Sequence, residues 1–526
     1  MQIRHLWPPG GMLFFIAPFA SLLVAFPADA QLGPGGTQFW SQDSPGIGVG
    51  LEAGSAMGTA VAAGDFNCDG FDDVAVGMPL ENLVQGNEAG RVLVLRGGPG
   101  GITAEGNVAW GQNSPVIGDQ AEGNDRFGSV LAAGDFDDDG CADLAVGVPM
   151  EELSGTAGAG AVNVIYGSPD GLTGDGDLFL TQLSGDLATA AEPGDRFGGA
   201  LAVGDLNNDG IDDLAVGSPG EDVGSVVDAG MVHVIYGSMT GLQVSGSTAL
   251  RRGVELDGPA QTGEGLGSAL AVGDYVGFLG DELAIGLPRS EVSGQDQAGA
   301  VILVSDVDGF AFQSLWHQDT PDVPGVSEEF DRFGSTLTAG DFSGDGFDEL
   351  AVGVPDEDRE SPAIGSIGAV NVLDFVTGTH QIWTQDDLPP EAEGLNERFG
   401  SALAAGDFNG DGAEDLAASA PLEDLGPLNM AGLVHVLFGE RGTGLTADGA
   451  QIWLQTINPS EAGDEFGHAL AVGRFAGRGH DLVIGVPGET VSGATGAGGI
   501  NVLYTEVLFA DGFEGGDTSA WSATAP

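Results

Sequence analysis

A unit of about 70 residues recurs seven times along this chain and spans most of its length. The most constant part of the unit is Gly-Asp followed by an apolar residue, and the spacings of the Asp position are 70, 70, 69, 67, 66 and 67 residues. The seven residues at this position are Asp65, Asp135, Asp205, Asp274, Asp341, Asp407 and Arg474. A fixed period overrides any domain count made from length, so the sequence predicts one repeat architecture rather than three or four domains.

The second unit shows what each repeat is expected to fold into. A strand of small residues runs to Gly134, an acidic turn covers residues 135–143, and a second strand, residues 144–146, ends at Gly-Val-Pro. A strand of β-branched and aromatic residues follows at 161–166, and a last short strand comes after a Gly-rich turn. Four strands without helical periodicity predict one antiparallel blade of a β-propeller.

The fourth strand carries its own recurring apolar position, with Gln recurring two residues later. The residues at this position are Trp40, Trp110, Leu180, Leu250, Trp316, Trp383 and Trp453. We interpret them as packing residues between blades rather than ligand-stacking residues. The first copy precedes the first full repeat, and no copy follows the last repeat. The N-terminal strand is therefore predicted to complete the seventh blade and to close an all-β, seven-bladed ring of four-stranded antiparallel blades.

These patterns predict three regions: a signal peptide at 1–30, the propeller at 31–505 and a C-terminal tail at 506–526, for which sorting and disorder are both open interpretations. The predicted closing strand is 37–43, and the predicted blades are about 46–113, 114–184, 185–253, 254–318, 319–385, 386–455 and 456–505.

Five of the acidic turns share a pattern of oxygen-bearing side chains that is typical of calcium loops. Positions 1, 3, 5 and 9 offer side-chain oxygens, position 7 offers a carbonyl, and position 6 is always Gly. Calcium takes six to eight oxygen ligands, and the Gly permits the sharp turn that folds them around one ion. Magnesium is less suited, because it keeps its waters and demands an octahedral shell. A polar hairpin turn is the alternative for one such loop, but five loops in register favour calcium.

The predicted ligands of about five structural calcium ions follow from this pattern. They are Asp65, Asn67, Asp69, Phe71 and Asp73; Asp135, Asp137, Asp139, Cys141 and Asp143; Asp205, Asn207, Asp209, Ile211 and Asp213; Asp341, Ser343, Asp345, Phe347 and Glu349; and Asp407, Asn409, Asp411, Ala413 and Asp415.

The fourth and seventh units lack the pattern. Val276 and Phe278 replace ligands in the fourth, and Arg474 replaces the first Asp in a shorter seventh loop, where Arg474 or Arg478 is a candidate internal cation.

The composition limits the classes of partner. The chain has 79 acidic and 14 basic residues and a formal net charge of −65, which excludes nucleic acid and anionic lipid as favoured partners. With 42% hydrophobic residues and acids at fixed positions, bound cations are a better explanation of this charge than disorder.

The N-terminus has the pattern of a secretory signal peptide, with Arg4, an apolar run at 12–26 and an Ala-Asp-Ala cleavage site. We therefore expect export to the medium or the cell surface. No other stretch is expected to span a membrane. Cys68 and Cys141 occupy different loop positions in consecutive units. Because we expect adjacent blades to hold such loops well apart, we expect two unpaired thiols.

Phe-Gly at the start of a unit and Gly-x-Pro after its acidic loop resemble the FG-GAP repeats of integrin α-subunits. Such pairs include Phe127-Gly128 with Gly147-Val148-Pro149, and Phe333-Gly334 with Gly353-Val354-Pro355. The resemblance covers about residues 37–505 and implies a seven-bladed propeller whose calcium loops face one end and whose ligands bind the other. It implies an exported, monomeric adhesion or binding module for an extracellular protein or glycan.

That other end carries a second regularity. A Glu follows each Gly-x-Pro closely, and an Arg often precedes Phe-Gly. These residues are Glu81, Glu151, Glu221, Glu291, Glu357, Glu423 and Glu489, with Arg126, Arg196, Arg332 and Arg398. We expect Glu–Arg pairs that rigidify this end; a carboxylate ring that binds a cationic or metal-bridged ligand is the alternative.

No nucleophile elbow, catalytic triad spacing or His-rich zinc motif stands out, which favours a non-enzymatic protein. The alternative is a secreted propeller enzyme, a lyase or hydrolase, that acts on polysaccharide. His233 and His435 share one strand position, which suits packing.

Overall fold

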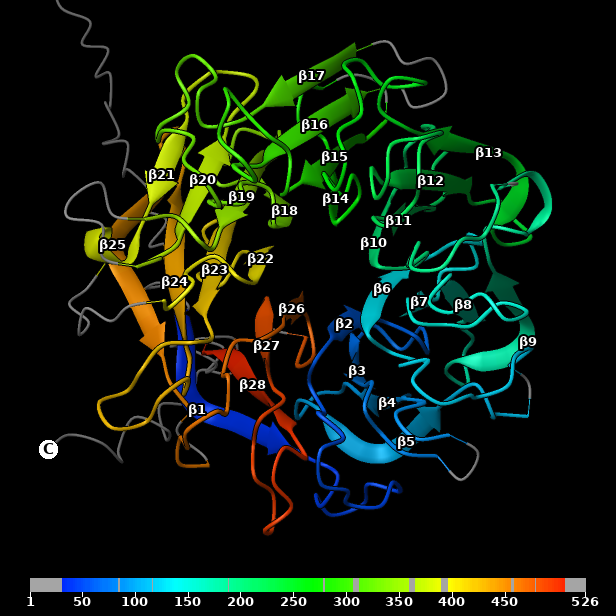
Figure 1. Cartoon of the computed structure of the whole chain (residues 1–526). Coiled ribbons are helices and arrows are strands. Elements are labelled where there is room, and N and C mark those ends of the chain that lie inside the picture. The colour runs from blue at the N-terminus through cyan, green and yellow to red at the C-terminus, as the bar shows by residue number, and fades with distance from the viewer. Residues whose placement is uncertain are drawn as a thin grey trace, which may run out of the picture.

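The computed structural model describes residues 31–506 apart from 84–85, 116, 188, 278–279, 306–311, 359–364, 389–395, 456–457 and 478. These residues form seven four-stranded antiparallel sheets arranged around one axis (Figure 1). The predicted all-β, seven-bladed propeller is confirmed. The predicted signal peptide at 1–30 lies outside the described residues, as does the predicted tail at 506–526 apart from Glu506, which ends the last strand.

Six blades are each made of four consecutive strands. Blade 1 contains β2 (Val61–Gly64), β3 (Asp73–Met78), β4 (Arg91–Arg96) and β5 (Thr103–Trp110). Blade 2 contains β6 (Val130–Gly134), β7 (Asp143–Val148), β8 (Ala161–Tyr166) and β9 (Thr173–Leu180). Blade 3 contains β10 (Ala200–Gly204), β11 (Asp213–Ser218), β12 (Met231–Tyr236) and β13 (Gln243–Leu250). Blade 4 contains β14 (Ala269–Gly273), β15 (Glu282–Leu287), β16 (Ala300–Ser305) and β17 (Phe312–Trp316). Blade 5 contains β18 (Thr336–Gly340), β19 (Glu349–Val354), β20 (Ala369–Leu373) and β21 (Gln381–Trp383). Blade 6 contains β22 (Leu403–Gly406), β23 (Asp415–Ala420), β24 (Leu433–Glu440) and β25 (Gly444–Trp453).

The seventh blade joins the two ends of the described chain. Strands β26 (Leu470–Gly473), β27 (Asp481–Val486) and β28 (Gly499–Glu506) are completed by the N-terminal strand β1 (Gln31–Trp40). This strand begins earlier than the predicted 37–43, because residues 31–33 also pair with β28 before a break in register. Closure by the N-terminal strand is confirmed, and it protects the edges that an open sheet would expose.

The first strand of every blade lies nearest the central axis, and the fourth lies at the rim (Figure 1). Neighbouring first strands contact one another around the ring, including β26 with β2. Two short 3-10 helices, Gly185–Leu187 and Gln385–Asp387, are the helical elements of the described residues.

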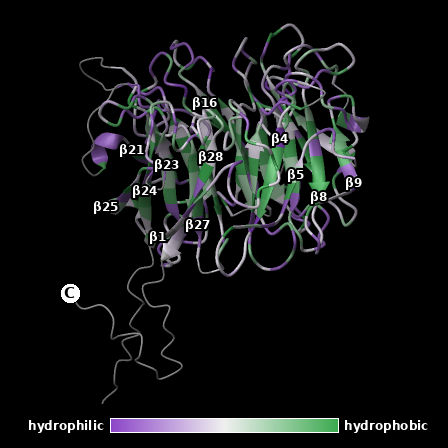
Figure 2. Ribbon diagram, turned by 90° about the horizontal axis from the view of Figure 1, so that it is seen from below, coloured by the Kyte–Doolittle hydropathy of each residue, from purple (hydrophilic) through white to green (hydrophobic). Residues whose placement is uncertain are grey.

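The core lies between neighbouring blades, in seven clusters of buried side chains. Each of these clusters contains, or is covered by, the recurring Trp or Leu of a fourth strand. Trp110, for example, packs with Val92 of its own blade and Phe127 of the next. The predicted packing role between blades is confirmed. Figure 2 shows apolar residues concentrated in the strands and polar residues in the loops at the two ends.

A glycine before the third strand of each blade makes a close backbone contact with the next blade. Gly498 has φ +76°, and a Cβ there would lie 2.3 Å from the carbonyl oxygen of Met57 in blade 1. The equivalent Gly90 would meet Phe127 of blade 2 at the same distance. No side chain fits between these backbones, so glycine is required at the seam.

Candidate calcium loops

Each acidic turn joins the first strand of a blade to the second. In blade 2 the antiparallel pairing of β6 with β7 sets Gly134 opposite Asp143 at the loop end and Val130 opposite Gly147 at the other end. The acidic loops, which are the candidate calcium loops, therefore lie at one end of the propeller, and the segments before Phe-Gly and after Gly-x-Pro lie at the opposite end. The residue after the first Asp anchors each loop, because its side chain is buried in all seven blades.

The side chain at position 1 organises the turn. Both Asp65 carboxylate oxygens accept backbone N–H groups, from Asp69 at 3.0 Å and Gly70 at 2.8 Å. Asp69 then accepts the N–H of Phe71 at 3.0 Å, and Gly70 has φ +88°. The same bonds recur in the other four loops, at Asp135, Asp205, Asp341 and Asp407. In each of the five loops, hydrogen bonds to the position-1 carboxylate thus hold residues 5 and 6 of the loop close to it.

The position-9 carboxylates are buried between strands. Asp143 accepts the N–H of Gly167 at 2.7 Å and that of Phe136 at 2.9 Å. Burial raises the pKa of Asp143 to about 7 and that of Asp415 to about 8. Each loses solvation on burial, so either a proton or a cation is favoured there at neutral pH. Binding of a cation would release protons.

In the loop of blade 2, the position-3 carboxylate lies beside those of positions 1 and 9. Carboxylate oxygens of Asp135, Asp137 and Asp143 all lie within 4.8 Å of one another. One oxygen of Asp137 is buried without a hydrogen-bond partner, and so is one oxygen of Asn207 at the same position in blade 3. Buried oxygens without donors are costly unless something else satisfies them. A hard cation would do so.

The acidic loop of blade 5 adjoins a cavity of about 130 Å³, lined among others by Ser343, Asp345 and Glu349 at positions 3, 5 and 9. Asp374 and Thr377, which follow the third strand of this blade, also line the cavity. This volume exceeds the roughly 30 Å³ that one water occupies, so an ion with some water ligands fits.

Blades 4 and 7 use the same turn without a metal pattern. Glu282 still fills position 9 in blade 4, where it accepts the N–H groups of Tyr275 and Val276. In blade 7, Asp481 accepts the N–H of Ala476 at 3.2 Å. The position-9 acid therefore has a structural role that does not depend on the other ligands. Phe278 and Arg478 lie outside the described residues.

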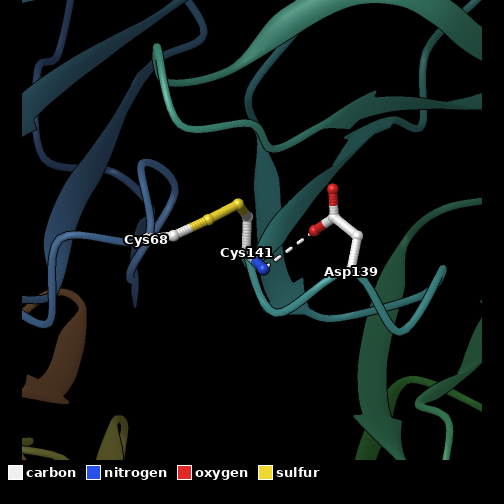
Figure 3. A group of neighbouring side chains, drawn as sticks. All are labelled: Cys68, Asp139 and Cys141. Carbon is white, nitrogen blue, oxygen red and sulfur yellow. Dashed lines mark hydrogen bonds between the residues drawn. A yellow bond between two sulfur atoms is a disulfide. The ribbon is translucent and has the colours of Figure 1, made fainter.

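The prediction of two unpaired thiols is wrong. Cys68 and Cys141 form a disulfide, with their Cα atoms 4.8 Å apart (Figure 3). The prediction assumed that loops of neighbouring blades are far apart. These loops follow the first strands, which lie nearest the central axis, and there the loops of neighbouring blades come into contact. The N–H of Ala142 in blade 2, for example, donates to the carbonyl of Asp65 in blade 1 at 2.9 Å. The disulfide thus links loop 1 to loop 2.

The predicted Glu–Arg pairs at the opposite end are also wrong. Glu151 is buried and accepts a hydrogen bond from Gln112 at 2.6 Å. The Gln that follows the fourth-strand Trp or Leu of one blade makes the same bond to the Glu of the next blade, for the Glu residues of blades 1, 2, 3, 5, 6 and 7. Arg126 instead pairs with Glu88, and Arg332 and Arg398 both pair with Asp356. Burial favours a neutral amide partner over a charged guanidinium, which stays near solvent.

Sequence reasoning missed a further acidic position, the residue just before position 9. In the doublets Asp212-Asp213 and Asp348-Glu349 the first acid accepts an N–H group from the preceding blade's loop. The repeated acid–acid doublet was the available signal.

The comparisons with known proteins agree with the geometry. The FG-GAP repeat family matches residues 57–95, 127–165, 197–235, 333–373 and 399–437, which are the five blades with intact loops. Phosphatidylinositol-glycan-specific phospholipase D of Rattus norvegicus is 42% identical over 116 residues, 22% of this chain and 14% of that protein. Integrin alpha-PS2 of Drosophila melanogaster is 31% identical over 244 residues, 45% of this chain and 16% of that protein. Integrin alpha-5 of Xenopus laevis is 34% identical over 181 residues, 33% of this chain and 16% of that protein.

The chain therefore spans only a small part of the length of these relatives. Among the described residues, no helix is long and apolar enough to cross a membrane. The chain is therefore a closed seven-bladed β-propeller, and five of its blades match the FG-GAP repeat family.

Proposed function

We propose that this protein is an exported, non-enzymatic ligand-binding or adhesion module whose scaffold is stabilised by calcium in the loops of blades 1, 2, 3, 5 and 6. The observation that carries the proposal is the coincidence of two features in the same five blades. They match the FG-GAP repeat family and they hold oxygen side chains at positions 1, 3, 5 and 9 around one turn. The similarity to integrin α-subunits supports the ligand-binding part.

Calcium suits the donor set. Carboxylate, amide, hydroxyl and carbonyl oxygens are the ligands it takes, and the buried oxygens of Asp137 and Asn207 need a partner. Extracellular calcium modules bind with dissociation constants of about 0.1–1 mM. At about 2 mM calcium each such site would add roughly 0.6–1.8 kcal/mol to the free energy of unfolding. The ions would therefore act as structural clamps.

Export is supported by two independent features. The N-terminal 30 residues have the pattern of a signal peptide, and Cys68 is joined to Cys141. Disulfides persist in oxidising compartments and are rare in the cytosol.

The ligand is expected at the end opposite the calcium loops. A cleft of about 390 Å³ lies there at blade 1, lined among others by Val49, Asn82, Leu83, Arg91 and Asn113. A concave site that mixes apolar side chains with a few polar ones is the usual form of a binding site. Arg91 pairs with Glu81 at 3.7 Å, and the other N–H groups of its guanidinium can donate to an acidic group of an extracellular protein or glycan.

The test is an array of glycans and extracellular-matrix proteins, probed with the full chain in calcium. We expect a calcium-dependent partner whose binding is lost in Arg91→Ala and retained in Arg196→Ala, with all three proteins melting alike. Arg196 is a matched control, because it lies at the same end in blade 3. Catalysed turnover of a glycan, or no binding at any position by a protein with a normal calcium-dependent melt, would contradict the proposal.

A further inference from the structure

At the end opposite the calcium loops, a buried acidic cluster lies at the junction of blades 1 and 2. Glu122 and Asp125 come from the segment before β6, and Glu151 follows β7. Carboxylate oxygens of these three residues lie within 4.8 Å of one another. Asp125 and Glu151 are buried, whereas Glu122 is exposed at the mouth of the cluster.

Short hydrogen bonds hold this cluster in place. The Gln112 amide donates to Glu151 at 2.6 Å and to Asp119 at 2.9 Å. The backbone N–H of Glu122 donates to Asp125 at 2.5 Å. The Gln112 side chain is fully buried, and its carbonyl oxygen has no hydrogen-bond donor.

The junction of blades 6 and 7 repeats the arrangement. Glu461, Asp464 and Glu489 bring carboxylate oxygens within 4.8 Å of one another. Gln455 donates its amide to Glu489, and Asn458 does so at 2.7 Å. Asp464 and Glu489 are each 1% exposed.

Two buried oxygens at this second cluster have no donor. They are one carboxylate oxygen of Asp464 and the side-chain carbonyl oxygen of Gln455. At the junction of blades 7 and 1, the equivalent oxygen is that of Gln42, which accepts a hydrogen bond from Ser55 at 3.2 Å. Ser55 occupies in blade 1 the position of Asp464. At the junction of blades 6 and 7 an Asp stands where Ser55 supplies this hydroxyl donor, and the Gln455 oxygen has no donor in its place.

The junction of blades 3 and 4 has a buried positive charge at the position of the Gln. Arg252 replaces the Gln, and Ser290 replaces the Glu after Gly-x-Pro. The buried Arg252 guanidinium donates to the fully buried Glu264 at 2.5 Å, and Ser290 Oγ lies 3.5 Å from it. A cation from the chain itself therefore sits among the acids at this junction.

We propose that the clusters Glu122–Asp125–Glu151 and Glu461–Asp464–Glu489 each bind a hard divalent cation of the calcium class, at the end of the propeller opposite the five calcium loops. Three carboxylates and a Gln oxygen are hard donors, and water can enter past the exposed Glu122 or Glu461. Blades 3 and 5 carry the same residue types, but three carboxylates converge within 4.8 Å only in blades 2 and 7 among the described residues of this end.

A shared proton is the competing explanation. Burial, with Asp119 and Asp125 nearby, raises the pKa of Glu151 to about 9, and burial raises the pKa of Asp464 to about 6. A cation would displace that proton, since the two satisfy the same acceptors. The test must therefore count ions and not only measure stability.

The experiment is equilibrium dialysis of the full chain against calcium chloride, with bound calcium measured per chain. Glu151→Gln and Glu489→Gln each remove one ligand. The matched control is Glu81→Gln, because Glu81 accepts from Gln42 at 2.7 Å as Glu151 does from Gln112, but has Ser55 in place of the Asp.

We expect each cluster variant to bind about one ion fewer than the wild type, and Glu81→Gln to bind the wild-type number. An unchanged ion number in both folded cluster variants would overturn the proposal and favour the shared proton. All three variants keep the five calcium loops. If those loops do not bind calcium, the wild type and the variants will therefore all bind about five ions fewer than expected, which distinguishes failure of the loops from failure of the clusters.

Crystals soaked in manganese chloride provide a measurement that does not depend on how the variants fold. Anomalous difference peaks at both clusters of the wild-type protein support the proposal. Peaks confined to the calcium loops overturn it.

Discussion

Asp135 and Asp212, the first acid of loop 2 and the eighth residue of loop 3, are joined by two hydrogen bonds. The N–H of Asp135 donates to the Asp212 carboxylate at 2.9 Å, and the N–H of Asp212 donates to the Asp135 carbonyl at 3.3 Å. The same link joins Asp205 to Asp281 and Asp274 to Asp348. The acidic loops of blades 2 and 3 are thus each held by a carboxylate of the next blade, so neighbouring loops should order one another.

The first prediction tests this link with Asp212→Ala. The N–H of Asp135 loses its acceptor, at a cost of about 1–3 kcal/mol, although Asp212 is not a predicted ligand. We expect one of the calcium sites to weaken roughly fivefold or more in isothermal titration calorimetry. Asp212→Asn keeps an acceptor oxygen and should bind as the wild type does. Equal binding by the Ala and Asn variants would contradict coupling between loops.

A second prediction concerns the disulfide between loops 1 and 2. It closes a sequence separation of 73 residues. Reduction, or the double substitution Cys68→Ser and Cys141→Ser, should lower the free energy of unfolding by about 2–4 kcal/mol. Chemical denaturation with and without a phosphine reductant measures this difference. The double variant should not respond to reductant, and an equal midpoint for the reduced and oxidised wild type would exclude the disulfide.

The third prediction uses a buried histidine. His435 is fully buried against the edge of Phe399, with ring centroids 5.6 Å apart, and burial lowers its pKa from 6.5 to about 4. Because the pKa of the folded state is depressed, this contribution to stability is present above about pH 6.5 and is lost as pH falls toward 4. The loss should reach on the order of 2–3 kcal/mol.

His435→Asn should flatten that acid decline, because Asn does not titrate. The substitution is conservative for this fold, since Asn163, Asn371 and Asn501 occupy the same strand position in blades 2, 5 and 7. Urea denaturation in EDTA from pH 8 to pH 4 compares the two proteins. Parallel curves across that range would show that His435 does not contribute.

The fourth prediction tests the seam that closes the ring. Gly498→Ala places a Cβ 2.3 Å from the Met57 carbonyl oxygen at φ +76°. We expect a loss of about 2 kcal/mol or more in the free energy of unfolding. Gly50→Ala is the control, because its Cβ would meet nothing within 4 Å. That control should stay within about 0.5 kcal/mol of the wild type. If both variants unfold alike, blade 7 does not depend on this contact.

Much of the fold follows from the period alone. The spacing of Asp65, Asp135 and their equivalents predicted seven blades, and the offset of Trp40 predicted closure by the N-terminal strand. These features are local in sequence, and each recurs in seven repeats. Seven copies of one pattern support the same fold prediction independently.

Contacts between blades were harder to predict. The disulfide depends on how close the loops of Cys68 and Cys141 come at the inner end, which no spacing reveals. The partner of Glu151 was assigned to an Arg because opposite charges attract. Burial reverses that preference in favour of Gln112, since a neutral amide loses less solvation than a guanidinium.

The most direct test of the account is thermal unfolding of the full chain in about 2 mM calcium and in excess EDTA, with bound metal counted by mass spectrometry. The account predicts a large calcium-dependent rise in melting temperature and at least about five calcium ions per chain. An unchanged melting temperature with no bound calcium would contradict it.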